Sequence, residues 1–262
     1  MVAVALSIVC SVLVSGTAVL LRPLQLDNEK QNRQRIILEV AGLLDNSGQD
    51  ASGKEQSLEQ LFSQIEAHVV ELASGEYVDT LDPATFDAQA ASRDPELAVE
   101  IPAARDIANI VQRAKYATVY MVRGESGLNT LILPVYGYGL WSTMYGFLAF
   151  EGDANTIKGL RFYQQAETPG LGGEVDNPRW RAQWQGKLAF GPDGEPKIEV
   201  IRGVVDDRAG AGDGTSAARY QVDGLAGSTL TGRGVTNLMH YWLGDEGFGP
   251  YLTRLKATGE VQ

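Results

Sequence analysis

The chain opens on a long uninterrupted apolar run. Residues 2–21 read VAVALSIVCSVLVSGTAVLL and carry no charge. At about 1.5 Å per residue, a helix of this length is about 30 Å long, which matches the hydrocarbon core of a bilayer. A cleaved signal peptide is the competing interpretation, because Gly16-Thr17-Ala18 suits a processing site. No Lys or Arg precedes the run, and it continues through Val19-Leu20-Leu21, so we predict a retained membrane anchor.

Apolar positions at helical spacing predict two helices after the anchor. The first covers residues 25–44 and ends at Asn46-Ser47-Gly48. The second covers residues 57–72, where Ser57 and Gln60 have the spacing of a capping box. The apolar faces consist of Ile36, Ile37, Val40 and Leu43 in the first helix, and of Leu58, Leu61, Ile65, Val69 and Leu72 in the second.

Runs of β-branched and aromatic residues predict strands later in the chain. These strands cover residues 116–122, 128–136, 157–163 and 198–205. A helix is predicted at residues 179–184, because Asn177-Pro178 supplies an N-cap residue and a first-turn proline. Two further helices are predicted at residues 231–243, with an interruption at Gly234, and at residues 251–256.

These elements together predict an α+β fold with a mostly antiparallel sheet, preceded by one N-terminal transmembrane helix. The chain contains no tandem repeat and no heptad array. We therefore divide it into a transmembrane anchor at residues 1–22, a helical N-terminal segment at residues 23–74 and an α+β domain at residues 75–262.

Composition narrows the chemistry that this domain performs. The 262 residues carry a formal net charge of −11, which repels phosphate backbones, so we expect no nucleic-acid partner. One cysteine and two histidines do not make an internal disulfide, an iron–sulfur cluster or a typical zinc site, and we expect no metal centre. Any redox chemistry of this chain must therefore be carried by an organic cofactor.

Two glycine-containing stretches are candidates for a ligand site. Residues 136–147 interleave aromatic residues with glycines, so the backbone can approach a flat ligand while Trp141 offers a stacking face. Residues 167–173 contain the turn signal Pro169-Gly170 and suit a loop that presents backbone N–H groups. Each stretch on its own is equally typical of a structural element, a twisted strand with packed aromatics in the first and a tight turn in the second.

A third stretch, residues 223–235, places three hydroxyl groups and Arg233 just before or within the start of a predicted helix. Backbone N–H groups and the helix dipole favour a phosphate at such a position, although hydroxyl residues there also serve as simple N-caps. The spacing does not match a P-loop, and no GxGxxG follows a parallel strand. We therefore expect no NADH site in this chain.

In combination, the three stretches resemble the C subunit of the sodium-translocating NADH:quinone reductase. The resemblance rests on GYGLWSTMYGFLAF, ETPGLGGEVDNPRWRAQWQGK and DGLAGSTLTGRGV, which follow one another behind a single anchor. It extends over nearly the whole chain, including VALSIVCSVLVSGTAVLLRPLQ near the start. The resemblance implies an FMN-binding domain with covalently attached FMN at residues 75–262.

The resemblance also implies the point of attachment. In that family the FMN phosphate is joined to the threonine that ends a Ser-Gly-Ala-Thr element, and this position is Thr229 here. An external flavin transferase makes the bond, using FAD and magnesium. This chain has Ala226 and Ser228 where the element has Ser and Ala, which places a second hydroxyl beside Thr229. The residues expected to line the isoalloxazine and ribityl chain are Trp141, Ser142, Glu167, Thr168, Leu171 and Gly172, and those expected around the phosphate are Ser228, Leu230 and Thr231.

The implied function is that of an electron-carrying subunit in a multi-subunit, membrane-bound NADH:quinone reductase of the bacterial inner membrane. The other subunits are the expected partners and supply the NADH site and the sodium path. The resemblance implies a periplasmic domain, whereas Arg22, Lys30, Arg33 and Arg35 after the apolar run would by charge alone keep it in the cytoplasm. Family members begin with a short basic segment, so we expect Met1 to be an internal start.

Three alternatives stay open on sequence grounds. The first is the G subunit of the related ferredoxin:NAD ion-pumping electron-transport complex, whose members share the flavinylated motif but are typically shorter. The second is a membrane-tethered module that binds FMN without a covalent bond. The third is a purely structural assembly subunit.

Overall fold

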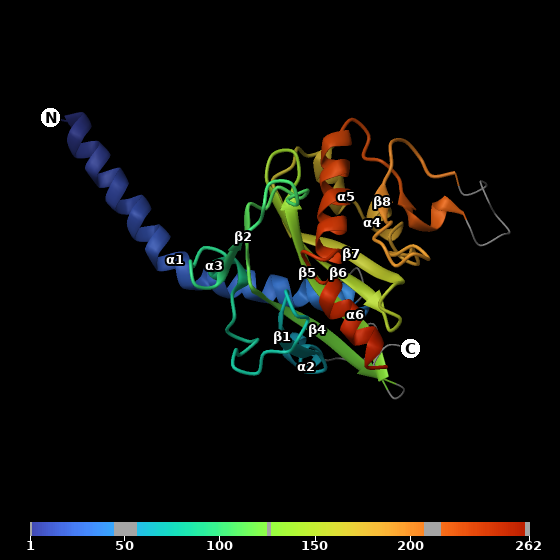
Figure 1. Ribbon diagram of the computed structural model, residues 1–262. Helices are drawn as coiled ribbons and strands as arrows, with labels where there is room; N and C mark the ends of the chain where they lie inside the picture. Colours follow the sequence, from blue (N-terminus) through green and yellow to red (C-terminus); the bar gives the residue numbers. More distant parts are fainter. Residues whose placement is uncertain (1, 45–56, 125–126, 207–215, 260–262) are drawn as a thin grey trace.

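A five-stranded antiparallel sheet forms the centre of the protein, with helices on both faces (Figure 1). This computed structural model describes residues 2–44, 57–124, 127–206 and 216–259. The strands pair in the order β1-β4-β5-β6-β7. Their bounds are Glu66–Glu71 for β1, Tyr116–Gly124 for β4, Gly127–Tyr138 for β5, Thr143–Glu151 for β6 and Ile157–Gln164 for β7. The predicted α+β fold with a mostly antiparallel sheet is confirmed.

The sheet is buried on both faces by alternating side chains. Strand β5 places Leu131 and Leu133 in one core and Ile132 in the other, all of them fully buried. Because successive residues of a strand point to opposite faces, this run of apolar residues serves both layers. The pairing of β5 with β6 runs without interruption from Thr130 opposite Glu151 to Tyr138 opposite Thr143, which fixes the register.

Helix α1, Val2–Val40, has two parts with different surroundings. Its first part projects away from the sheet (Figure 1) and is exposed, and it is long and apolar enough to cross a membrane, with a mean hydropathy of 2.4 over its most apolar window. Its last turns pack on the sheet through Ile36, Ile37 and Leu38. The segments predicted as separate helices at residues 2–21 and 25–44 thus belong to one helix. Pro23, which lies between them, is accommodated within α1.

The end of α1 differs from the prediction. The helix stops at Val40 rather than near Leu44, because Gly42 adopts a left-handed φ of 75°. The N–H of Leu43 bonds the carbonyl of Leu38, and the N–H of Gly42 bonds that of Glu39, which together make a Schellman motif. The predicted stop at residues 46–48 lies outside the described residues.

The helix predicted at residues 57–72 is wrong beyond its first turns. The Ser57 and Gln60 capping box is present, but α2 covers only Leu58–Phe62. The following residues form the edge strand β1, which pairs with β4 through six residue pairs, including Val69 opposite Thr118. Long-range pairing of β-branched residues therefore overrides the helical spacing that the sequence presents.

The other face of the sheet is covered by α5, Thr229–Leu243, and α6, Gly249–Ala257. Helix α5 is continuous through Gly234, which was predicted to interrupt it. A Cβ at Gly234 would lie 2.6 Å from the carbonyl oxygen of Tyr138 and 3.0 Å from Gly139. The glycine therefore permits close approach of α5 to the backbone between β5 and β6.

Shorter elements surround this framework. Helix α4, Pro178–Ala182, begins at the predicted N-cap Asn177, whose side chain accepts from the Arg179 N–H. The strand predicted at residues 198–205 is reduced to β8, Glu199–Val200, because Gly203 has a φ of 88° and the chain turns there. The remaining elements are α3 (Ala88–Ala91), β2 (Ala98–Glu100), β3 (Gln112–Ala114), β9 (Gln221–Val222), and the 3-10 helices η1 (Gly172–Asp176) and η2 (Ala217–Tyr220).

Candidate functional site

The three glycine-containing stretches meet at one buried carboxylate. Glu167 lies in the loop after β7 and is 5% exposed. Its Oε1 accepts hydrogen bonds from backbone N–H groups of the turn between β5 and β6, and its Oε2 accepts one from the first turn of α5. The donors are the N–H groups of Leu140 at 3.0 Å, Trp141 at 2.9 Å and Ser142 at 3.4 Å, and the hydroxyl of Thr231 at 2.6 Å.

Electrostatics keep this carboxylate ionised. Burial alone would raise the pKa of Glu167, but the hydrogen bonds from Thr231 and from the three backbone N–H groups hold its pKa below the ordinary value. A carboxylate that accepts several hydrogen bonds is stabilised in its charged form. The ionised Glu167 side chain therefore connects the loop after β7 to the turn between β5 and β6 and to α5 by hydrogen bonds.

Glycine is required where these segments touch. A Cβ at Gly172 would lie 2.6 Å from the Thr231 hydroxyl oxygen and 2.7 Å from Oε2 of Glu167. A Cβ at Gly139 would lie 2.5 Å from Oε1 of the same carboxylate. No side chain fits at these two positions without displacing Glu167, so the two glycines are part of the site.

The start of α5 presents two neighbouring hydroxyls in different surroundings. Ser228, the residue before the helix, is 5% exposed, and its Oγ lies 2.8 Å from the Oγ1 of Thr231. Thr229, the first residue of α5, is exposed and lines a cavity. Ser228 is thus buried in the hydrogen-bonded chain that ends at Glu167, whereas Thr229 is an exposed residue at the cavity.

The cavity beside Thr229 has a volume of about 420 Å³. The loop after β8, the turn at residues 224–227 and the first two turns of α5 form its walls. Arg202 and Arg233 line it against one carboxylate, Glu199, and the N-terminus of the 15-residue helix α5 adds its dipole and its unbonded N–H groups. The surroundings of the Thr229 hydroxyl therefore suit a negatively charged group such as a phosphate.

Large apolar side chains are exposed on the segments that Glu167 holds together. Trp141 is 65% exposed, Leu230 is 52% exposed and Leu171 is 42% exposed. Leu171 also reaches the turn before α5, because its Cδ2 would lie 2.9 Å from a Cβ at Gly227, whose φ of 71° favours glycine. Exposed apolar groups of this size beside a polar cavity are typical of a ligand or interaction site.

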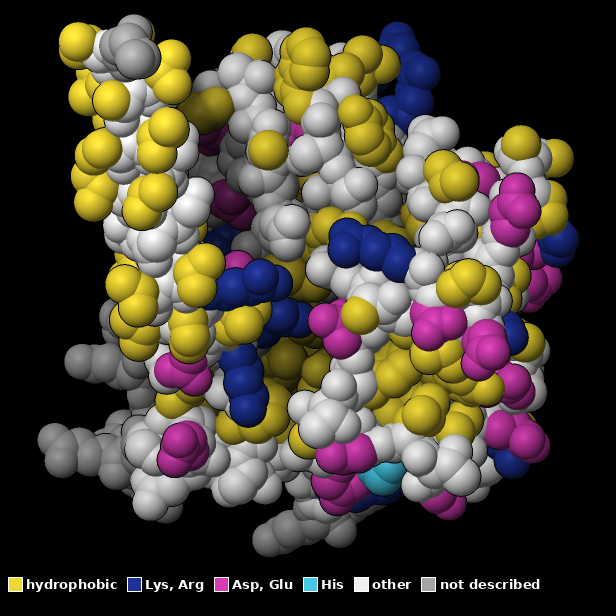
Figure 2. Space-filling view, turned by 90° about the vertical axis from the view of Figure 1, so that its left-hand side faces the viewer, with side chains coloured by type: hydrophobic (Ala, Val, Ile, Leu, Met, Phe, Trp, Pro, Cys, Tyr) yellow, Lys and Arg dark blue, Asp and Glu magenta, His cyan; other side chains and the backbone are white. Residues whose placement is uncertain are grey.

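This site lies at the same end of the domain as the apolar part of α1. Figure 1 shows the N-terminal end of α5 at the top of the view, toward which the N-terminus of α1 also rises. Figure 2, turned by 90° about the vertical axis, shows hydrophobic side chains gathered at the top of the domain beside the projecting apolar helix. The N-terminal ends of α1 and α5 thus both lie toward the top of Figure 1, although they are well separated across the view.

The structure joins most of the predicted site residues. Glu167, Ser228 and Thr231 form one hydrogen-bonded chain, the Ser142 hydroxyl accepts the Ala166 N–H, and Gly172 packs against Glu167. Thr168 has a backbone role, since its carbonyl accepts the N–H groups of two residues in the following turn. The assignment of these residues, and of Trp141, Leu171, Leu230 and Thr229, to FMN remains a prediction.

Sequence reasoning missed one wall of the cavity. Arg202 and the rest of the loop after β8 line the cavity beside Thr229. The two positions are 27 residues apart in the sequence, so local patterns do not link them. Only the isolated positive charge of Arg202 in an acidic chain signals such a role. The Leu140 N–H was missed as well, because a backbone donor leaves no trace in the sequence.

Comparisons with known proteins agree with this arrangement. The FMN-binding domain family matches residues 139–244, which include all three glycine-containing stretches apart from the first residues of the first. The C subunit of the Na(+)-translocating NADH-quinone reductase of Pseudomonas aeruginosa is 49% identical over 257 residues, covering 98% of this chain and 94% of that protein. The protein of the same name from Yersinia pestis is 44% identical, covering 98% and 91%.

Two crystal structures extend the similarity to the fold. NqrC of Shewanella oneidensis has a TM-score of 0.73 at 35% identity, covering 86% of this chain and 96% of that one. The C subunit of the Na(+)-translocating NADH-quinone reductase from Parabacteroides distasonis has a TM-score of 0.63 at 26% identity, covering 89% and 97%. The chain therefore belongs to the NqrC family, the C subunits of Na(+)-translocating NADH-quinone reductases.

Proposed function

We propose that this chain is the electron-carrying C subunit of a membrane-bound Na(+)-translocating NADH-quinone reductase, with FMN joined through its phosphate to the Thr229 hydroxyl oxygen. The observation that carries the proposal is the contrast at the start of α5 between the exposed residue Thr229, which lines the cavity, and the buried, hydrogen-bonded Ser228. The FMN-binding family match over residues 139–244 supports the cofactor, and the named relatives support the complex.

The residues present fit a phosphoflavin. The basic cavity and the α5 N-terminus would hold the phosphodiester, with Arg202 and Arg233 supplying positive charge. The exposed faces of Trp141, Leu171 and Leu230 would contact the isoalloxazine and the ribityl chain. Ser142, Thr168 and Gly172 would shape the loop and turn beneath them.

Glu167 would act on the flavin site by positioning. Its hydrogen bonds hold the turn that carries Trp141 and the helix that carries Thr229 in one arrangement. Bound FMN supplies reversible one- and two-electron chemistry, and the chain keeps it in place while partners exchange electrons with it. Fixing both ends of the cofactor to rigid elements maintains the short distances on which electron transfer depends.

The covalent bond requires a group transfer from outside the chain. In the proposed step, the Thr229 oxygen attacks the flavin-side phosphorus of FAD, the bridging P–O bond breaks, AMP leaves, and the hydroxyl proton passes to a base of the flavin transferase. Thr229 is suited to this step because it is an exposed residue, whereas Ser228 is buried and its hydroxyl is hydrogen-bonded to that of Thr231.

The experiment is flavin fluorescence of the protein band on a denaturing gel after co-expression with a flavin transferase. Wild type and Ser228→Ala are expected to fluoresce, and Thr229→Val is expected to be dark, because valine keeps the branched shape and lacks the oxygen. Mass spectrometry should place one FMN, less one water, on the peptide that contains Thr229. A label that survives Thr229→Val and disappears in Ser228→Ala would reassign the acceptor.

The same experiment separates the covalent from the noncovalent hypothesis. A wild-type band without fluorescence, together with flavin that is released on denaturation, would favour a noncovalent FMN-binding module. Absence of flavin from both the native and the denatured protein would favour a structural subunit.

Topology and partners follow from the same assignment. We place the domain in the periplasm, on the outer side of the inner membrane, with other subunits of the reductase as its partners. A C-terminal alkaline phosphatase fusion, which is active only in the periplasm, is expected to be active, and a C-terminal fluorescent protein that matures only in the cytoplasm is expected to be dark. The opposite pattern would place the domain in the cytoplasm, as the basic residues after the span would by themselves suggest.

A further inference from the structure

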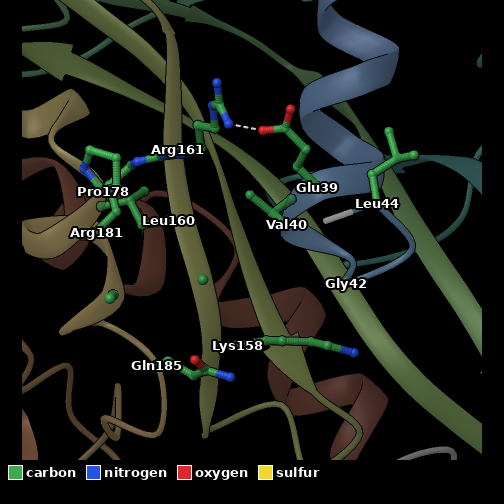
Figure 3. Close-up of a pocket in the computed structure, with 12 residues that line it drawn as sticks. Glu39, Val40, Gly42, Leu44, Lys158, Leu160, Arg161, Pro178, Arg181 and Gln185 are labelled. Atoms are coloured by element: carbon green, nitrogen blue, oxygen red, sulfur yellow. Dashed lines mark ion pairs between the residues drawn. The ribbon is translucent and has the colours of Figure 1, made fainter. Parts of the chain in front are cut away.

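A second cavity of about 330 Å³ shares no lining residue with the cavity beside Thr229. It lies between the end of α1, strand β7 and helix α4, and Figure 3 shows these three elements around it. The polar side chains that line it are Glu39 from α1, Lys158 and Arg161 from β7, Arg181 from α4, and Gln185 just beyond α4. Nothing in the flavin site uses these residues.

Positive charge exceeds negative charge at this cavity. Glu39 is the lining carboxylate, and it forms ion pairs with Arg161, across the cavity (Figure 3), and with Arg35 on its own helix. One carboxylate therefore serves two guanidinium groups. A second carboxylate, Asp176, acts on Arg161 and Arg181 from outside the lining. Among the described residues, four basic side chains therefore share two carboxylates, which leaves an excess of two positive charges in a chain whose net charge is −11. The basic residues are Arg35, Lys158, Arg161 and Arg181, and the carboxylates are Glu39 and Asp176.

Arg181 is the basic residue of this cavity that has a buried donor without a hydrogen-bond partner in the described part of the chain. Figure 3 shows it extending from α4 toward β7, where Arg161 lies. Its Nε is buried and, within the described part of the chain, has no hydrogen-bond partner. Burial and then the charge of Arg181 lower the pKa of Arg161, so the two guanidinium groups also repel each other. A buried donor without a partner is costly, and an acceptor placed between the two groups would satisfy both needs.

Lys158 also lines the cavity and adds to its positive charge, although its side chain extends away from the two arginines (Figure 3). Its Nζ donates to the Thr130 hydroxyl at 2.9 Å, which leaves two ammonium hydrogens for another acceptor. Its stem passes beneath the turn that ends α1, where its Cε would lie 3.1 Å from a Cβ at Gly42. The cavity is thus bordered by donors on two elements and capped by the end of the membrane-directed helix.

We propose that this cavity binds a phosphate group, with Arg161 and Arg181 as its donors. Guanidinium groups match the oxygens of a phosphate in pairs, and a tetrahedral anion accepts from several directions at once. The group is either free phosphate or the headgroup of an anionic phospholipid, and the two arms of the test distinguish these sources. In both cases the ligand joins β7 to α4, which follows directly on the η1 helix that begins at Gly172 of the flavin loop.

The test is thermal unfolding of the full-length protein in a non-ionic detergent. Sodium phosphate is compared with sodium chloride at equal ionic strength, and a short-chain phosphatidylglycerol is compared with the matching phosphatidylcholine. For wild type we expect a saturable rise in Tm of about 4 °C with phosphate, with phosphatidylglycerol, or with both. A response to phosphate assigns a free-phosphate site, and a response to phosphatidylglycerol alone assigns a lipid headgroup.

Variants on one helix locate the response. Arg181→Met should abolish it, with Arg181→Gln as a second variant if the first does not fold. Arg179→Met is the matched control, because Arg179 is exposed on the same helix and does not line the cavity, so it should respond like wild type. The proposal is overturned if sodium chloride produces the same rise, if neither ligand acts on wild type, or if the rise persists without Arg181.

Discussion

Thr231 donates its hydroxyl hydrogen to Oε2 of Glu167 across 2.6 Å, although 64 positions separate the two residues in the chain. This bond fastens α5 to the loop after β7. Oε1 of the same carboxylate bonds the turn that carries Trp141, so one buried side chain determines how three glycine-containing segments lie relative to one another. Substitutions at Thr231, at Glu167 and at the neighbouring Gly172 measure how much this hydrogen bond contributes to the stability of the domain.

Removing the Thr231 hydroxyl should destabilise the domain. In Thr231→Val, Oε2 of the buried carboxylate loses its donor, which costs about 1–3 kcal/mol of unfolding free energy. Thr231→Ser keeps the hydroxyl and should lose much less. Chemical denaturation of both variants measures the difference. Equal losses in the two variants would mean that the methyl group of Thr231, rather than its hydrogen bond, stabilises the protein.

The Glu167 carboxylate should make stability depend on pH in the acid range. Because its folded-state pKa lies below the ordinary 4.5, the contribution is fully present above that value and is lost as pH falls through the folded pKa. Glu167→Gln does not titrate, so the difference in unfolding free energy between wild type and this variant should shrink as the pH is lowered below 4.5. Denaturant titrations between neutral pH and acid test this. A difference that is constant with pH would contradict the role assigned to the charge.

A single methyl group at Gly172 should disturb the site. Gly172→Ala places a Cβ within 2.6 Å of the Thr231 hydroxyl oxygen and 2.7 Å of Glu167, which costs about 1–3 kcal/mol by overpacking. Gly159→Ala is the control, because a Cβ at that position on β7 meets nothing within 4 Å. Differential scanning calorimetry should show a lower Tm for Gly172→Ala alone. Identical melting of the two variants would contradict the close contact.

Two truncations should separate the membrane anchor from the folded domain. Removing residues 1–24 deletes the exposed apolar part of α1 and should yield a soluble, folded protein. Removing residues 1–42 also deletes Ile36, Ile37 and Leu38, which cover Phe147 on the sheet, and should cost at least about 4 kcal/mol. Solubility and circular dichroism check both. Equal behaviour of the two proteins would show that the end of α1 is dispensable for folding.

The sheet was predictable where local pattern and long-range pairing agree. The β-branched and aromatic runs that became β4, β5 and β7 contain strand signals that their partners reinforce. Residues 66–71 were predicted as helix because Ile65, Val69 and Leu72 have helical spacing. Their pairing partner, β4, begins 45 or more residues later, so no window of local sequence contains the information that determines β1.

The candidate site was predictable in its parts rather than in its connections. The stretches around Trp141, Glu167 and Thr229 were identified from glycine and hydroxyl patterns and from the family resemblance. The chain of hydrogen bonds that runs from Ser228 through Thr231 to Glu167 depends on packing between distant segments, and the sequence does not encode it locally. The basic wall formed by Arg202 was invisible for the same reason.

Pro23 affects how the folded domain is held relative to the apolar part of α1. Proline has no N–H, so the carbonyl of Val19 lacks its usual helical partner at the point where the apolar part of α1 ends. The 17 residues that follow Pro23, up to Val40, form a lever about 26 Å long, whose far end is packed onto the sheet. A change of about 10° at Pro23 would swing that end by about 5 Å. The orientation of the domain relative to the bilayer is thus controlled by the stiffness of the helical turn at Pro23, whereas their separation is fixed by the length of the helix.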